Sequence, residues 1–424
     1  MIILLTTIKL IHLQSTKYLN NYMIRLLSAL FSILIFSACT KEKTGIPIIH
    51  IHHPADFSWE SKLPCEISYI TNNDSIRIPA KIKRRGGISS KYYKGSFTFK
   101  LNENHALAGL PSDNDWILNA GYIDKTFMRH KISYDIFREM SPNNIAPEVA
   151  YVELYVNNKY EGLYQLTERM DSKRLKIDKT DPNATTFKGP PLFYKDKISY
   201  VQDSSNYYHQ KSPDITKRDN TVELDNLRSF LFNANDSLFS SRIDQHFDIN
   251  SIIDWHLILL LSNNSDGIMK NFYLYKQQTN TPYKIAIWDY DHSFGRDGDN
   301  EYNMMERNIK MEVNVLFCRL LELNPNQYKE KLIQKWNLLR TSNILTEENI
   351  YKKIAAIDQE ITPYVLKNDA IWPANAEWYY DENSYQQEVD IIKEYLTKRL
   401  VYLDTYFKVL LLMDHSCDQP WPKA

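Results

Sequence analysis

The sequence lacks the features that most quickly narrow the function of an unknown chain. Its 51 basic and 52 acidic residues leave a formal net charge of −1 over 424 residues, so bulk charge does not indicate nucleic acid or an anionic membrane as a partner. The chain contains no internal repeat and no low-complexity tract. Its four cysteines form no C-x-x-C pair and no Cys/His pattern of the kind that binds zinc. What remains is an ordinary globular composition, long enough for one large domain or two modest ones.

The apolar run near the N-terminus is too short to cross a bilayer. It covers residues 26–36 and follows Arg25, which is typical of the core of a signal peptide. The residues just before Cys39 are small and resemble a bacterial lipobox. We therefore predict a signal peptide over 1–39 with its true start at Met23, a lipid on Cys39 and a polar tether over 40–45. This predicts a lipid-anchored protein of the bacterial cell envelope; an ordinary cleaved signal is the alternative.

The other three cysteines, Cys65, Cys318 and Cys417, are widely spaced. We predict structural or free thiols with at most one disulfide, as suits an exported protein. His50 and His52 alternate along a predicted strand without an evident acidic partner. A plain strand is therefore favoured over a metal site at this position.

Strand-like and helix-like segments occupy different parts of the chain. Alternating or β-branched runs predict strands at 46–51, 65–71, 76–84, 97–101, 149–155 and 160–167. Apolar periodicity predicts helices at 125–140, 225–232, 249–261, 311–323, 328–339, 347–366 and 385–412. The polar segment 178–220, which contains several prolines, is predicted to be a loop excursion. The pattern predicts an α+β fold, strand-rich over 46–170 and mainly helical over 171–424.

The stretch 263–296 carries the residues on which the functional prediction depends. Asp266 and Asn271 precede a predicted hairpin whose second strand ends at Asp289 and Asp291. Neighbouring carboxylates are costly to bury unless a cation compensates them. Carboxylate and amide oxygens without His or Cys suit Mg²⁺ rather than Zn²⁺. The order D-x-x-x-x-N, hairpin, D is also that of a protein-kinase catalytic loop and its metal-binding Asp.

This stretch resembles the CotH kinases, the spore-coat-protein-H-like family of atypical, secreted-type protein kinases. The matching residues are Asn263, Asp266, Asn271, Phe272, Leu274, Tyr275, Trp288, Asp289, Tyr290, Asp291, Phe294 and Gly295. Upstream blocks resemble the family in the same order, at 85–90, 96–100, 109–116, 125–131 and 152–168. The resemblance covers roughly residues 80 to 300. Three positions depart from the family pattern: Gly87 and His130 replace Asn, and Asn158 replaces Gly.

The resemblance implies a two-lobed, kinase-like fold and phosphorylation of Ser or Thr in exported proteins with ATP and Mg²⁺. Asp266 would orient the acceptor hydroxyl, while Asn271, Asp289 and Asp291 would bind metal. The resemblance further implies a nucleotide site with Lys100 on the phosphates, Arg85 and Gly86 near them, and Glu168 where the chain crosses between lobes. The predicted helix 125–140 would pack on the small-lobe sheet. Asp135 and Glu139 on this helix are alternative partners for Lys100.

Two other functions were weighed against the kinase. The chain could be a non-catalytic surface lipoprotein that binds a nucleotide or a protein with the same fold, although retention of all the polar site residues argues against it. A glycoside hydrolase with paired carboxylates is disfavoured. Asp289 and Asp291 lie two positions apart on one chain segment, which does not provide the opposed geometry that such an enzyme needs.

Overall fold

The structure, a computed structural model, describes residues 45–53, 56–194, 204–296, 305, 308–372, 375–376, 379–380 and 383–415. The predicted signal peptide with Met23, the lipid on Cys39, most of the tether and Cys417 lie outside these residues. From Ile46 onward the chain forms one compact unit, and its strands and helices confirm an α+β fold. Among the described helices, none combines the length and the apolar character needed to span a membrane.

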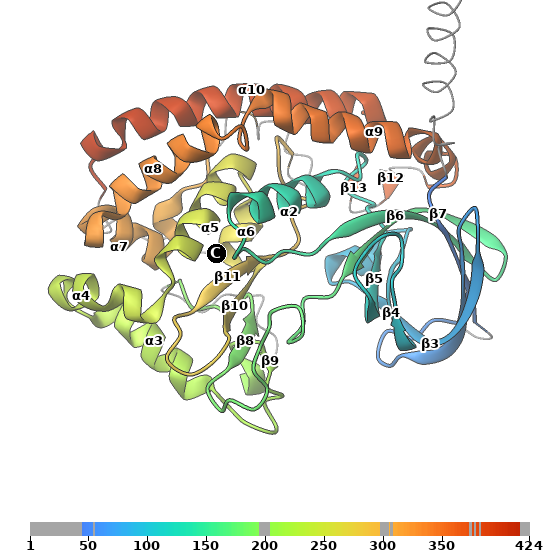
Figure 1. Cartoon of the computed structure of the whole chain (residues 1–424), viewed down its shortest axis with the longest axis horizontal. Helices are drawn as coiled ribbons and strands as arrows, with labels where there is room; N and C mark the ends of the chain where they lie inside the picture. Colours follow the sequence, from blue (N-terminus) through green and yellow to red (C-terminus); the bar gives the residue numbers. More distant parts are fainter. Residues whose placement is uncertain are drawn as a thin grey trace, which may run out of the picture. The chain divides into compact units, whose positions relative to one another are not determined.

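Seven strands close into a barrel in the order β1-β2-β3-β4-β5-β7-β6 (Figure 1). They are β1 (Ile48–His52), β2 (Leu63–Ile70), β3 (Ser75–Arg85), β4 (Ser96–His105), β5 (Asp113–Asn119), β6 (Val149–Val156) and β7 (Lys159–Glu168). The pairing is antiparallel except where β1 and β6 close the barrel in parallel. Strand alternation places Phe97 and Phe99 in the barrel core and Thr98 and Lys100 on its outer face.

The predicted strands of the first half are confirmed, and β5 is an additional strand that the sequence analysis missed. The predicted hairpin is β6–β7, which turns at Asn157 and Asn158 with φ of 46° and 68°. Asn is one of the residues that tolerates a left-handed conformation in a turn. Asn158 therefore makes the same kind of turn as the glycine that the family has at this position.

A second, four-stranded sheet has the order β11-β10-β8-β9. Its strands are β8 (Thr185–Lys188), β9 (Gln210–Ser212), β10 (Phe272–Lys276) and β11 (Lys284–Ile287). The predicted loop 178–220 is therefore wrong in part, because it supplies two strands. These strands have four and three residues, which is too short for an alternating pattern to stand out from its polar surroundings.

Helices form the larger hydrophobic core together with this second sheet. They are α2 (Arg129–Met140), α3 (Thr221–Asn233), α4 (Asp236–His246), α5 (Ile249–Ser262), α6 (Ser265–Met269), α7 (Val315–Leu323), α8 (Tyr328–Thr341), α9 (Glu347–Asp369) and α10 (Tyr385–Val409). Shorter elements are β12 (Asn375–Ala376), β13 (Tyr379–Tyr380), η1 (Ile88–Lys91), η2 (Ser204–Asn206), η3 (Met311–Val313), η4 (Pro325–Gln327) and η5 (Leu410–Leu412). The predicted helices are confirmed, and α4 and the short α6 are additional.

Helix α2 differs from its prediction in position and in surroundings. It begins at Arg129 rather than Lys125. Its apolar residues Ile132, Ile136 and Phe137 belong to the helical core, and the helix packs on α5 and α9. The helix was expected to pack on the small-lobe sheet; its main contacts are with helices, and Val149 and Tyr151 of the barrel strand β6 belong to the same core. Figure 1 shows α2 lying below the long helices α9 and α10.

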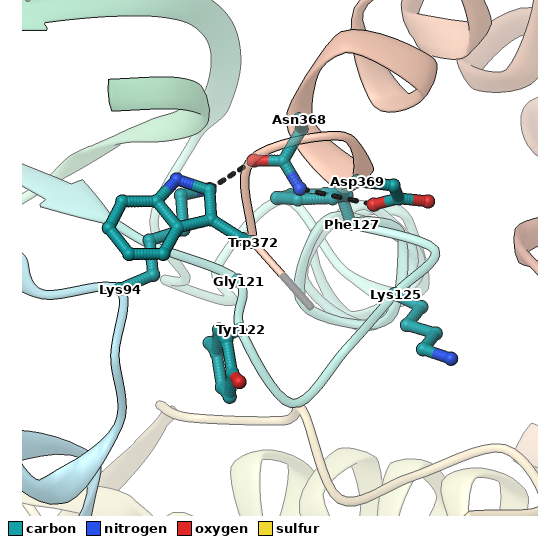
Figure 2. Close-up of a pocket in the computed structure, with 8 residues that line it drawn as sticks. All are labelled: Lys94, Gly121, Tyr122, Lys125, Phe127, Asn368, Asp369 and Trp372. Atoms are coloured by element: carbon teal, nitrogen blue, oxygen red, sulfur yellow. Dashed lines mark hydrogen bonds between the residues drawn. The ribbon is translucent and has the colours of Figure 1, made fainter. Parts of the chain in front are cut away.

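Lys94 ties the barrel to helix α9 and is fully buried. Its ammonium donates to the carbonyl of Ala120 at 2.7 Å and to the carbonyl of Leu163. It also donates to Oδ1 of Asn368 at 2.8 Å (Figure 2). Burial lowers the pKa of Lys94 well below its ordinary value, and the carboxylates of Asp369 and Glu161 oppose this shift. We therefore interpret Lys94 as a structural link between the barrel and α9, beside a cavity of about 150 Å³.

The described cysteines differ in state. Cys65 is a free thiol whose pKa burial raises to about 12. Cys318 is buried and disulfide-bonded.

Candidate functional site

The residues of stretch 263–296 are held by a tight succession of caps and turns. Asn263 ends α5 in a left-handed conformation with φ of 55°. Asn264 then caps α6, because its side chain accepts a hydrogen bond from the Gly267 N–H at 2.8 Å. This places Asp266 in the first turn of α6, where its carboxylate pairs with Lys270 at 3.0 Å.

Asn271 lies against the backbone of Asp289, as expected for the two ends of the β10–β11 hairpin. Its side-chain nitrogen donates to the Asp289 carbonyl at 2.8 Å. The amide oxygen is thus the atom that Asn271 can offer to a metal. Asp289 itself has φ of 62°, a left-handed conformation that is uncommon outside glycine and is concentrated at functional sites.

Helix α2 fixes the backbone that carries the two aspartates. The Asp289 N–H donates to the hydroxyl of Tyr134 at 2.9 Å. The next N–H, of Tyr290, donates to Nδ1 of His130 at 2.9 Å. His130 and Tyr134 are one helical turn apart, so a single face of α2 holds two successive peptide groups of the site.

The side chains of His130, Asp289 and Asp291 form a cluster whose ligand atoms lie within 4.8 Å of one another. Nε2 of His130 is 3.8 Å from Asp289 and 4.0 Å from Asp291. Burial works to raise the pKa of Asp289, but His130, Lys188 and Arg85 outweigh it and lower the pKa. The pKa of Asp291 is raised by burial and by the charge of Asp289. The two carboxylates therefore have different preferences for a proton.

This group fits a divalent cation. Two adjacent carboxylates, one of them with a raised pKa, gain from a shared positive charge. Asp289 and Asp291 supply hard oxygen ligands, and Asn271 adds an amide oxygen beside them. Such ligands suit Mg²⁺ or Mn²⁺.

A cavity of about 510 Å³ lies between the outer face of the barrel and the second sheet. Lys83 and Arg85 of β3 and Thr98 of β4 line one side, while Lys188 of β8 and Tyr273 of β10 line the other. The basic side chains that line it are Lys62, Lys83, Arg85, Arg169, Lys188 and Lys211. Asp171 is the acidic residue among its described lining. The cavity therefore favours an anionic ligand.

Trp288 joins this cavity to the aspartates. It lines the cavity and directly precedes Asp289. The charged groups of Arg85 and Lys188 lie 5.7 and 5.6 Å from the centre of its ring. Burial lowers the pKa of Lys188 to about 8; Asp289 opposes this shift, and Arg85, Lys211 and Arg169 add to it. Lys188 and Arg85 are therefore close enough to influence both the cavity and the carboxylates.

The structure does not bring Lys100 to this cavity. Lys100 is exposed on β4, opposite Lys81 and Asp115, and it is not among the residues that line the cavity. Neither proposed acid pairs with it. Asp135 pairs with Lys131 at 3.2 Å and with Arg138, and Glu139 pairs with Lys353.

Of the other predicted nucleotide-site residues, Arg85 lines the cavity, whereas Gly86 and Glu168 are not in its described lining. Gly86 makes the turn after β3 with φ of 139°, and a Cβ there would lie 2.5 Å from Oγ of Ser89. The Glu168 carboxylate binds Arg174 at 2.7 Å and accepts from the Glu148 N–H at 2.8 Å. The Glu168 carboxylate is thus engaged by Arg174 and Glu148 and is not part of the described cavity lining.

Sequence reasoning missed Lys83 and Lys188, and it gave no structural place to His130. Lys83 lies two positions before Arg85 on one strand face, a spacing that could have indicated it. Lys188 lies in the segment interpreted as a loop. His130 was noted only as a departure from the family pattern.

Comparison with known proteins places this chain among the CotH kinases. The family model described as "CotH kinase protein" matches residues 82–403, so the chain belongs to this family. The chain is also similar to "Inner spore coat protein H" of Bacillus subtilis (strain 168). The two are 24% identical over 392 residues, which cover 87% of this chain and 100% of that protein.

Proposed function

We propose that this protein is an ATP- and Mg²⁺-dependent kinase that phosphorylates Ser or Thr in exported or surface proteins. The observation that carries the proposal is the position of the cationic cavity directly beside the Asp289–Asp291 cluster. A nucleoside triphosphate needs basic groups near its phosphates and hard oxygen ligands for its metal. Membership of the CotH kinase family supports the same reading.

In this proposal the barrel, within the predicted part 46–170, and the mainly helical part 171–424 serve as the two lobes of a kinase-like fold. Trp288, Tyr273 and Ile117 give the cavity an apolar surface for a base. Lys188 and Arg85 bind the phosphates. Asp289, Asp291 and Asn271 hold the metal, which would neutralise charge on the transferred phosphoryl group.

Asp266 orients the acceptor. The oxygen of a Ser or Thr hydroxyl attacks the γ-phosphorus, the bond between this phosphorus and the β–γ bridging oxygen breaks, and ADP leaves. Asp266 accepts the hydroxyl proton. It is half-buried and lies outside the cluster of His130, Asp289 and Asp291, so it is available for this task without binding metal.

One observation favours a second candidate, a nucleotide-binding protein that transfers nothing. Asp266 is paired with Lys270 at 3.0 Å, and a base engaged in this way must release its partner to receive a proton. Incorporation of γ-phosphate from labelled ATP into Ser- and Thr-containing acceptor proteins separates the two candidates. Transfer that requires Mg²⁺ is expected. Binding of Mg·ATP with no transfer, including to the protein itself, would favour the second candidate.

We also propose that the protein is exported and held at the cell envelope by a lipid on Cys39. The disulfide at Cys318 supports export, since disulfides persist in oxidising compartments. Fractionation of the Cys39→Ala variant tests the anchor. Loss of the variant from the membrane fraction is expected, and unchanged membrane association would contradict the proposal.

A further inference from the structure

His130 is held in one orientation from several sides. The side chain is only 5% exposed. Its ring stacks on Tyr134 with a centroid separation of 5.7 Å, and Nδ1 receives the Tyr290 N–H at 2.9 Å. Nε2 faces the other way, towards Asp289 and Asp291, and the side-chain nitrogen of Asn119 lies 3.1 Å from it.

This orientation fixes the tautomer of the neutral ring. A backbone N–H can only donate, so Nδ1 of His130 must accept and cannot carry a proton. The proton of the neutral imidazole is therefore on Nε2, the atom that faces the carboxylates. The side chain of Asn119 can turn its oxygen to this proton in exchange for its present bond to the Gly121 N–H.

A proton on Nε2 conflicts with metal binding through this atom. A histidine ligand presents a lone pair to the metal and usually keeps its proton on the other nitrogen, where a second partner accepts it. Here the other nitrogen faces a donor. Ligation by Nε2 would require an imidazolate ring, and turning the ring over would break the bond to Tyr290.

We propose that His130 is a positioning residue of the metal site and not a metal ligand: Nδ1 holds the Asp289–Tyr290 backbone and Nε2–H faces the two carboxylates. This inference rests on the proposed function, because it concerns the metal of the same site. It follows that oxygen atoms of the protein bind the metal even though a histidine lies within the cluster. The site should then prefer Mg²⁺ or Mn²⁺ over Zn²⁺, which favours nitrogen and sulfur ligands.

Manganese loaded into the protein without nucleotide reports the ligands directly. Pulsed electron paramagnetic resonance of bound Mn²⁺ detects a nitrogen atom in the coordination sphere. We expect no signal from a coordinated histidine nitrogen in the wild type and the same spectrum in His130→Ala. Nuclear magnetic resonance of the metal-free protein with ¹⁵N-histidine should show His130 protonated on Nε2 and not on Nδ1.

The Mn²⁺ affinity tests whether His130 positions the metal ligands or only lies next to them. Partners that orient metal ligands typically contribute about 10–100-fold to metal affinity, so the Mn²⁺ dissociation constant should rise by this order in His130→Ala. His130→Gln places an amide N–H near the position of Nε2 and should recover part of the loss. Equal affinity of wild type and His130→Ala would overturn the positioning role.

A coordinated nitrogen signal in the wild type that disappears in His130→Ala would overturn the inference and leave the kinase proposal intact. Mn²⁺ affinity that is unchanged in Asp289→Asn and Asp291→Asn would instead overturn the metal site of the proposed function. The wild-type spectrum answers the question even if a variant fails to fold.

Discussion

Lys188 is the residue that most changes the picture of the nucleotide site. It is half-buried, lines the cationic cavity and lies 5.6 Å from the ring of Trp288. Lys100, which the family resemblance indicated for the phosphates, is exposed on the outer face of the barrel. The structure therefore indicates Lys188 as the lysine that binds the phosphates of ATP, whereas the family resemblance indicates Lys100.

Lys188→Met should weaken Mg·ATP binding, and Lys100→Met serves as its matched control. A hydrogen bond to a charged group contributes about 1.5–3 kcal/mol, which corresponds to roughly a 10- to 100-fold rise in the dissociation constant. We expect this loss for Lys188→Met and little change for Lys100→Met, measured by titration calorimetry. The reverse ranking of the two variants would return the phosphate role to Lys100.

The lowered pKa of Lys188 adds a pH dependence to this binding. With a pKa of about 8, the ammonium is present below pH 8 and is lost as pH rises through that value. Because phosphate binds the charged form, ATP affinity should fall between pH 7 and pH 9. Lys188→Arg stays charged over this range and should remove the fall. The same fall in the Arg variant would assign it to another group.

At the scale of elements, helix α2 joins the site to the helical core through Arg129. This side chain is fully buried. It pairs with Asp124 at 2.6 Å and Glu388 at 3.0 Å, and it donates to the Ser293 carbonyl at 2.9 Å. One guanidinium thus connects α2, α10 and the segment after Asp291.

Arg129→Met should destabilise the protein strongly, since it takes the guanidinium from the buried carboxylate of Asp124 and leaves Glu388 with Arg296 alone of its two arginines. Breaking a buried ion pair costs about 3–5 kcal/mol. Lys131→Met is the matched control, because its i,i+4 pair with Asp135 lies near the surface and contributes a fraction of that amount. Urea unfolding of both variants tests this. Equal stabilities would mean that Arg129 does not hold these elements together.

Strand β8 supports the loop that carries Asn271 through a glycine. Gly189 has φ of 51°, and a Cβ there would lie 2.1 Å from the carbonyl oxygen of Lys270. Gly189→Ala should therefore displace the 270–271 peptide and reduce Mg·ATP binding and turnover. Gly95→Ala is the control, because a Cβ there would meet the end of the flexible Arg84 side chain at 3.6 Å. Wild-type Mg·ATP binding by Gly189→Ala would show that the 270–271 peptide can move without weakening the site.

At the scale of the whole molecule, the sequence predicted the fold class and most elements, because their patterns are long and periodic. The polar residues at the ends of the hairpin could also be placed together, because Asn271 and Asp289 lie at the two ends of one local unit. Lys188 and His130 were not predicted as site residues because their roles arise from contacts between segments that are distant in the sequence. His130 meets the Tyr290 backbone across 160 positions, and no local pattern reports such a contact.

The most direct test of the kinase account compares Asp266→Asn with the wild type, using phosphate incorporation at saturating Mg·ATP. Orienting and proton-accepting groups typically contribute about 10²–10⁴-fold to the rate. We predict a loss of this size in turnover with an unchanged dissociation constant for Mg·ATP, because Asp266 lies outside the described metal cluster. Lys270→Met removes the partner of Asp266 and should retain transfer. Wild-type turnover in Asp266→Asn would contradict the proposed mechanism.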